Sequence, residues 1–182
     1  GTDGGLRKLD AGVPDIAVVA GPVETDAAVT DLGGWEREWG LVVPAEGSQV
    51  ESLADLVDGD VRFVNRDRQS GLRTSFDAAL TDLAEERGTD RRALADDIDG
   101  YTLTTQAHES PARTVAAGDA DAGLGLRATA AKLDLGFVPV GTQSVRVLGN
   151  PDRTAKDSVQ QFERVLDDAE SVAASFPGIE LA

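Results

Sequence analysis

Cysteine and methionine are absent from this chain of 182 residues, and aromatic residues make up only 4 % of it. Without cysteine the chain can form no disulfide, thiolate metal site or cysteine nucleophile. It has one histidine, His108, so it cannot supply a pair of histidines to a metal ion. With so few aromatic residues, the core must be built from Ala, Val and Leu.

Long apolar runs are also missing. No stretch of about 18 apolar residues occurs, so we expect no membrane span. No signal-peptide pattern is visible, and we expect a cytoplasmic rather than an extracellular location, with an upstream signal left open. The sequence begins at Gly1 without methionine, from which we expect a segment of a longer chain with a domain fused upstream.

Negative charge is the dominant feature of the composition. Asp and Glu number 33 against 17 Lys and Arg, for a formal net charge of -16. Such a field repels nucleic acid and anionic membranes, so we expect no nucleic-acid contact by this segment. Disorder is one interpretation of an acidic chain. The regular apolar periodicity favours another, a folded, halophilic protein in which salt screens the self-repulsion.

Strand-like and helix-like segments alternate along the chain, which predicts an α/β fold. Residues 41–43 form a short apolar run. A helix is predicted from about 71 to 87, because Leu72, Phe76, Leu80 and Leu83 recur at helical spacing, and a second long helix is predicted over about 155–174.

Residues 42–48 and 140–147 are extended and rich in Gly, Pro or Thr, as hinges are. They divide the chain into two predicted lobes, each with a mainly parallel sheet, joined by two hinge strands. Lobe one comprises residues 1–43 with 141–182, and lobe two comprises residues 44–140.

The most informative segment is a buried strand that ends at Asn65 and leads into a helix opened by Gly71. The loop between them carries Arg66, Arg68 and Ser70. Free backbone N–H groups and the positive end of the helix dipole converge at such a helix start, which makes an anion site. Alternatively, Ser70 merely caps the helix and the arginines pair with surface carboxylates. Local chemistry does not decide between these two interpretations.

Three other segments are weaker candidates. His108 stands before a helix that Pro111 starts, although a surface histidine beside a capped helix is the favoured interpretation. The small residues around Gly123 and Gly125 lack the dinucleotide fingerprint, so we favour tight packing. The first residues could present Thr2 to an anion, or could form a frayed terminus.

These segments occur in a distinctive order, which is Asn65-Arg66, Ser70-Gly71, Arg73, Gly100-Tyr101, His108, residues 118–125 and residues 135–139. The series resembles the periplasmic-binding-protein-like domain at the C-terminus of some molybdopterin molybdenumtransferases, also found fused to molybdate-type regulators, here of haloarchaeal character. The resemblance implies a type II periplasmic-binding-protein-like fold, and it implies that lobe one lacks its first strand here, since that strand is expected upstream of residue 1. It also implies a ligand held by helix N-termini and hydroxyls, and molybdate or tungstate as that ligand.

The resemblance also assigns the ligand-binding residues, which are Thr2, Asn65, Arg66, Ser70, Gly71, Arg73 and His108. Two positions depart from the family pattern. Gln69 stands where the family usually has Gly, and Leu72 stands where it has Thr. A hydroxyl is therefore lost, and a larger side chain is gained, at the N-terminus of the helix that Gly71 opens, which we call the helix mouth. No metal ligands, catalytic residues or other cofactor are expected.

The sequence therefore predicts a domain that binds or senses a small anion and has no catalysis of its own. The alternative is an accessory C-terminal domain of a molybdenum-cofactor biosynthesis enzyme that serves regulation or metal delivery. A hydrolase using His108 is disfavoured, because no nucleophile-elbow motif is present. The aromatic region around Trp35 and Trp39 suggests either a homodimer contact or packing under the hinge.

The charge imbalance generates the first prediction. We expect the midpoint of thermal unfolding to rise as KCl is increased from dilute to molar concentration, because the Debye length falls to about 3 Å at 1 M. A neutral osmolyte at the same osmolality is the control, since it adds no screening. Highest stability in dilute buffer would contradict the halophilic interpretation.

Overall fold

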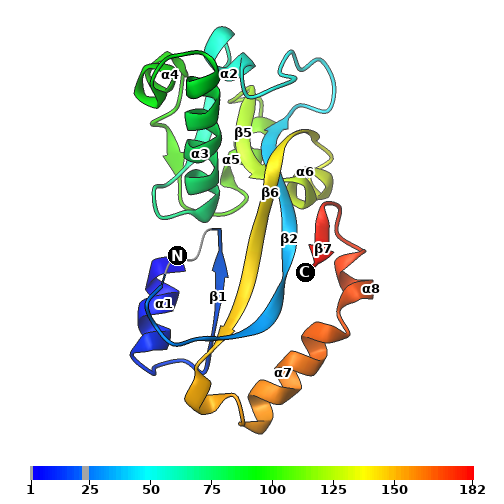
Figure 1. Ribbon diagram of the computed structural model, residues 1–182. Coiled ribbons are helices and arrows are strands. Elements are labelled where there is room, and N and C mark those ends of the chain that lie inside the picture. The colour runs from blue at the N-terminus through cyan, green and yellow to red at the C-terminus, as the bar shows by residue number, and fades with distance from the viewer. Residues whose placement is uncertain (1, 22–24) are drawn as a thin grey trace. The chain divides into compact units, whose positions relative to one another are not determined.

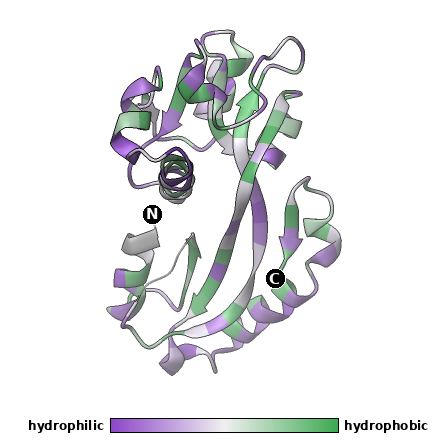
Figure 2. Ribbon diagram, turned by 45° about the horizontal axis from the view of Figure 1, so that its top comes forward, coloured by the Kyte–Doolittle hydropathy of each residue, from purple (hydrophilic) through white to green (hydrophobic). Residues whose placement is uncertain are grey.

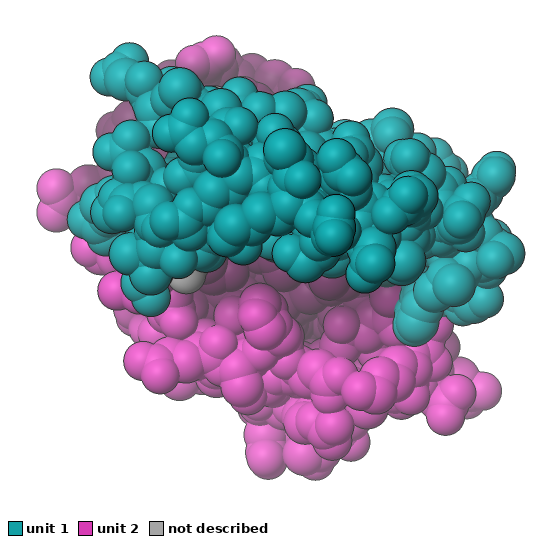
Figure 3. All heavy atoms as spheres, turned by 90° about the horizontal axis from the view of Figure 1, so that it is seen from below, with its two compact units in different colours: residues 1–37, 143–182 teal, residues 38–142 magenta. Residues whose placement is uncertain are grey.

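The computed structural model describes residues 2–21 and 25–182, and their side chains from residue 4 onwards. The chain forms two compact units, coloured separately in Figure 3: unit 1 is Gly1–Arg37 with Gln143–Ala182, and unit 2 is Glu38–Thr142. The chain crosses between them within the long strands β2 (Thr30–Val43) and β6 (Gly136–Gly149). The sequence had placed these crossings at 43/44 and 140/141. Whether the units act as ligand-binding lobes stays a prediction.

Unit 1 combines parts of the two long strands with shorter elements from both ends of the chain (Figure 1). These elements are α1 (Thr2–Asp10), β1 (Ile16–Ala20), the 3-10 turn η1 (Pro151–Arg153), α7 (Asp157–Asp167), α8 (Glu170–Ala173) and β7 (Ile179–Leu181). Strand β1 pairs with β6, and β7 pairs with β2, both antiparallel.

Unit 2 contains the remaining elements, in which helices follow strands. They are α2 (Asp55–Asp58), β3 (Phe63–Arg66), α3 (Gly71–Glu86), α4 (Arg91–Asp97), β4 (Thr104–Thr105), α5 (Ser110–Ala116), β5 (Ala122–Leu126) and α6 (Arg127–Lys132). Strand β3 lies between β4 and β5 and runs parallel to both, whereas β5 pairs antiparallel with β2.

The predicted α/β class is confirmed, but the expectation of a mainly parallel sheet in each lobe is wrong for unit 1. A parallel pair needs a long crossover connection. Strand β6 instead enters unit 1 as the continuation of a strand from unit 2, and it runs opposite to β1. The predicted tail helix over residues 155–174 is two helices, α7 and α8, and they are followed by a strand that the pattern did not indicate.

Strand β2 begins at Thr30, whereas the sequence predicted only a short apolar run at 41–43. The prediction was too short because glycines interrupt the apolar pattern of the strand. Gly34 lies so close to the neighbouring strand that a Cβ there would be 2.1 Å from the carbonyl oxygen of Val145. The glycine is therefore required by packing, although it has low strand propensity. Farther along β2, Trp39 is only 4 % exposed and belongs to the core of unit 2, so it is not available for the suggested dimer contact.

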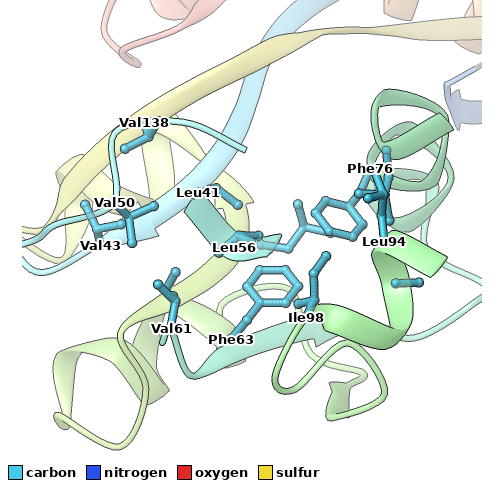
Figure 4. Packing of buried hydrophobic residues seen from close by; sticks show 14 of the residues in the cluster. Leu41, Val43, Val50, Leu56, Val61, Phe63, Phe76, Leu94, Ile98 and Val138 are labelled. Carbon is cyan, nitrogen blue, oxygen red and sulfur yellow. The ribbon is translucent and has the colours of Figure 1, made fainter. Parts of the chain in front are cut away.

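The core of unit 2 forms between the strands and α3, with side chains converging from β2, β3, α2 and α4 (Figure 4). Phe63 of β3 stacks on Phe76 of α3 with their ring centroids 5.3 Å apart, and neither is exposed to solvent. The apolar positions predicted for this helix, Leu72, Phe76 and Leu80, are buried on one face. The predicted packing role of Gly123 is confirmed, since a Cβ there would meet Pro111 of α5 at 2.9 Å.

Unit 1 has smaller apolar clusters. Leu32, Val147 and Val159 form one of them, with α7 contributing Val159. Hydrophilic and hydrophobic residues alternate along α7 (Figure 2), as expected for a helix with one buried face. Within residues 2–21 and 25–182, no helix has the length and apolar character that crossing a membrane requires.

The stacked pair generates a stability prediction. Phe76→Ala should lower the free energy of unfolding by about 3–5 kcal/mol, because it removes a fully buried ring and leaves a cavity. Phe176→Ala is the matched control: its ring is half exposed, so the change should stay within about 0.5 kcal/mol. Urea unfolding followed by circular dichroism measures both. Equal effects would contradict the proposed packing.

Candidate functional site

Three parallel strands of unit 2 end at one edge, and a helix follows each of them. Strand β3 leads to α3, β4 to α5 and β5 to α6. Ligands of open α/β sheets bind outside the carboxyl ends of the strands, where helix N-termini present backbone donors. The motif singled out in the sequence lies at this edge, which makes the start of α3 the candidate site.

Helix α3 begins with an unused hydroxyl. Ser70 is its N-cap residue with extended backbone, yet within the described chain its side chain makes no capping hydrogen bond. Asp67 shapes the loop instead: its carboxylate accepts from Gln69 N at 2.9 Å and its carbonyl accepts from Ser70 N at 3.1 Å. The first N–H groups of a helix, here those from Gly71 onwards, have no intrahelical acceptor. The helix mouth thus offers backbone donors and a hydroxyl together.

Arg66 is a buried cation at the end of β3, with only 3 % of its surface exposed. Its Nη1 donates to the Ala107 carbonyl and its Nη2 to the Gln106 carbonyl at 2.8 Å, which holds the loop before α5. Burial lowers the pKa of Arg66, and the charge of Asp67 opposes that shift. In the part of the chain that the structure describes, no carboxylate forms an ion pair with Arg66.

Two buried polar atoms near the ends of β3 and β4 lack hydrogen-bond partners among the described residues. They are Nε of Arg66 and Oγ1 of Thr105. Arg66 and Thr105 are register partners on β3 and β4, so both atoms belong to the same edge of the sheet. An unpaired buried charge or donor is costly unless another group satisfies it. This edge therefore has unused capacity to bind an anion.

Arg73 has its charge satisfied within the protein. Its Nε donates to Asp77 at 2.9 Å, and its guanidinium lies 4.1 Å from the ring centroid of Tyr101. The Tyr101 hydroxyl donates to the same carboxylate at 2.8 Å and accepts from Arg91 at 2.9 Å. These contacts anchor the start of α3. Sequence reasoning missed Asp77, although its spacing of four residues from Arg73 is the helical ion-pair spacing.

Asn65 and Gly100 position this network. Asn65 is fully buried; its amide donates to the Tyr101 carbonyl at 3.2 Å and its oxygen accepts from Arg66 N at 2.8 Å. Gly100 has a φ of +91°, and a Cβ there would lie 1.9 Å from the Phe63 carbonyl oxygen. Only glycine allows this approach, which places Tyr101 against Arg73. The predicted ligand contacts of Asn65 and Arg73 stay predictions.

The departure at Leu72 has a different consequence from the one expected. Leu72 is 4 % exposed and packs in the core with Phe76, so its larger side chain does not occupy the helix mouth. The reason is helical geometry, which turns successive residues of the first turn to different sides. Gln69 is exposed on the loop before α3. Of the two departures from the family pattern, only Gln69 therefore adds a solvent-exposed side chain beside the N-terminus of α3.

The remaining predicted residues lie elsewhere. His108 is exposed, just beyond the loop that Arg66 holds. Thr2 is in α1 of unit 1, and its side chain lies outside the described residues. Over the described ranges, no group of three or more His, Asp or Glu side chains is arranged to hold a metal ion. The structure thus groups Asn65, Arg66, Ser70, Gly71 and Arg73 at one edge of unit 2.

Comparison with solved structures finds several similar folds. The substrate-binding domain of a putative molybdenum ABC transporter from Clostridium difficile matches with a TM-score of 0.55 and 19% identity, over 99% of this chain and 83% of that one. The sulfate-bound regulatory domain of the OxyR2 E204G mutant from Vibrio vulnificus matches with a TM-score of 0.62 and 15% identity, over 92% and 77%. At these identities the likeness establishes the fold alone.

A third similar structure is the regulatory domain of MetR, a LysR family regulator from N. meningitidis, with a TM-score of 0.61 and 12% identity over 97% of this chain and 81% of that one. No curated protein sequence matches this chain. The model of the PBP superfamily domain matches residues 15–167, which is most of the chain. With its α/β units joined through β2 and β6, the chain belongs to the PBP superfamily.

Proposed function

We propose that this chain is a binding or sensing domain for a small oxyanion, with molybdate or tungstate as the ligand. The observation that carries the proposal is the buried guanidinium of Arg66, which has no ion-pair partner in the described chain and an unsatisfied Nε. An anion at this edge would offset the cost of that charge. It would also accept hydrogen bonds from Ser70 and the first N–H groups of α3.

Several features support a tetrahedral oxyanion over a larger anion. Backbone N–H groups and a hydroxyl donate to oxygen acceptors and supply no bulky apolar contact. Two of the similar folds are consistent with this chemistry, a putative molybdenum transporter domain and a sulfate-bound regulatory domain. The order of motifs across residues 65–139 resembles that of the domain fused to molybdenum enzymes and regulators. This resemblance is the reason for proposing molybdate or tungstate among the oxyanions.

The single histidine makes a site-specific test possible. In a chain labelled with 13C-histidine, the ring signals belong to His108 alone. Molybdate or tungstate should shift them saturably and raise the midpoint of thermal unfolding, since a ligand that binds the folded state stabilises it. Sulfate and phosphate serve as competitors. No saturable change with any of the four anions would overturn the proposal.

Ser70→Ala separates binding from stability. The Ser70 hydroxyl caps nothing in the described structure, so the variant should unfold at the same denaturant concentration as the parent. It should bind the oxyanion about tenfold more weakly, because a hydrogen bond to a charged group contributes about 1.5–3 kcal/mol. Ser171→Ala, at an exposed serine of α8, is the control and should leave the Kd unchanged. Unchanged affinity in Ser70→Ala would contradict the assigned site.

Within this proposal, the same motif order favours a domain that serves a molybdenum-cofactor biosynthesis enzyme or a molybdate-responsive regulator. The full reading frame distinguishes them. An upstream molybdenumtransferase domain would indicate regulation or metal delivery to that enzyme, and an upstream helix-turn-helix would indicate a regulator. Contacts with DNA would then come from the upstream domain, because this chain carries a net charge of -16.

A further inference from the structure

A cluster of arginines lies on unit 2, beside α3 and α4. They line a pocket of about 530 Å³ formed by the loop before α3, the first turns of α3, helix α4 and the Tyr101 segment. Its charged lining residues are Arg68, Arg73, Arg91, Arg92, Asp77 and Asp96. We refer to it as the arginine pocket.

The charge of the arginine pocket is opposite to that of the chain. Four arginines face two aspartates, a net charge of +2, whereas the whole chain carries -16. The chain contains only fourteen arginines, so their gathering here is not what a uniformly acidic surface predicts. A local positive potential in a negative field selects for a ligand that brings its own negative charge.

The arginines of the pocket fall into two kinds. Arg73 and Arg91 are engaged with Asp77 and the Tyr101 hydroxyl, and they form a fixed floor. The side chains of Arg68 and Arg92 are exposed. Within residues 2–21 and 25–182, neither guanidinium group makes a hydrogen bond or an ion pair. The pocket thus presents two unused guanidinium groups above a structured, hydrogen-bonded base.

We propose that the arginine pocket, whose lining does not include Ser70 or Gly71, binds the phosphate group of a small phosphate ester. A phosphate monoester carries a charge of about -1.5 to -2 at pH 7, close to the charge that the pocket offers. Guanidinium groups bind phosphate oxygens in bidentate geometry. The volume of the pocket exceeds what a bare ion needs and falls in the range of sites for small organic molecules.

The chain has one tyrosine, so the ring signals of a 13C-tyrosine label belong to Tyr101, which lines this pocket. At constant ionic strength, glucose 6-phosphate should shift the ring signals of Tyr101 saturably, and glucose should not. Inorganic phosphate should bind at least tenfold more weakly than the ester. The His108 signals should not follow the same titration curve, which keeps this result separate from oxyanion binding at α3.

Arg92→Gln and Arg68→Gln test the unpaired groups, and each should weaken ester binding about tenfold. Arg164→Gln is the matched control, because Arg164 is an exposed arginine of α7 in unit 1 without an ion pair in the described chain. If Arg164→Gln weakened ester binding equally, the loss of one positive charge anywhere on the chain would explain the effect, and the proposed site would be contradicted. The proposal is also overturned if the ester does not shift Tyr101, or if inorganic phosphate binds as tightly as the ester.

Discussion

The parallel pairing of β3 with β4 and β5 determines the rest of unit 2. It brings three strand ends to one edge, and therefore the starts of α3, α5 and α6 as well. Two glycines allow close packing around these strands: Gly100 lets the segment before β4 lie against the backbone of Phe63, and Gly123 of β5 lets Pro111 of α5 pack on it. The stacked Phe63 and Phe76 rings then hold α3 over the strands. Core packing and the candidate site are thus consequences of one arrangement.

The arginines of unit 2 show how an acidic chain uses scarce positive charge. Arg73 is buried and fully engaged with Asp77 and Tyr101, so its role is to anchor the start of α3. Arg66 is equally buried, but its partners are neutral carbonyls, which accept hydrogen bonds without neutralising the charge. A buried cation in that state is stabilised by any anion that reaches it. The difference between the two residues lies in their partners, because their burial is nearly the same.

Membership of the PBP superfamily narrows the function to a class but does not choose the ligand. The similar folds include a transporter substrate-binding domain and regulatory domains, at 12–19% identity. One architecture therefore serves proteins with different roles, and function is determined by the side chains at each site. In this chain the side chains that we propose for ligand binding are Ser70 and Arg66 at the strand edge, and Arg68 and Arg92 in the arginine pocket.

Much of the fold follows from local pattern. The 3.6-residue spacing of Leu72, Phe76 and Leu80 predicted α3, and the apolar run before Asn65 predicted β3 one or two residues from its bounds. Strand β2 was mostly missed, because Gly34 and Gly40 are required by packing across the sheet and Gly33 has a φ of +109°, so none of the three follows local strand propensity. Strand direction in unit 1 was also mistaken, since pairing between distant segments leaves no periodic signal in either one.

By itself, the sequence determined the acidic surface, the helix mouth at Ser70-Gly71 and the concentration of arginines in one short segment. Only the tertiary structure decided how those groups are used. It turned Leu72 into the core and engaged Arg73 with Asp77 and Tyr101, and among the described residues it left Arg66 buried with no carboxylate partner. The physical reason is that the partner of a charge is chosen by distance in space, and the partners here come from segments that only folding brings together.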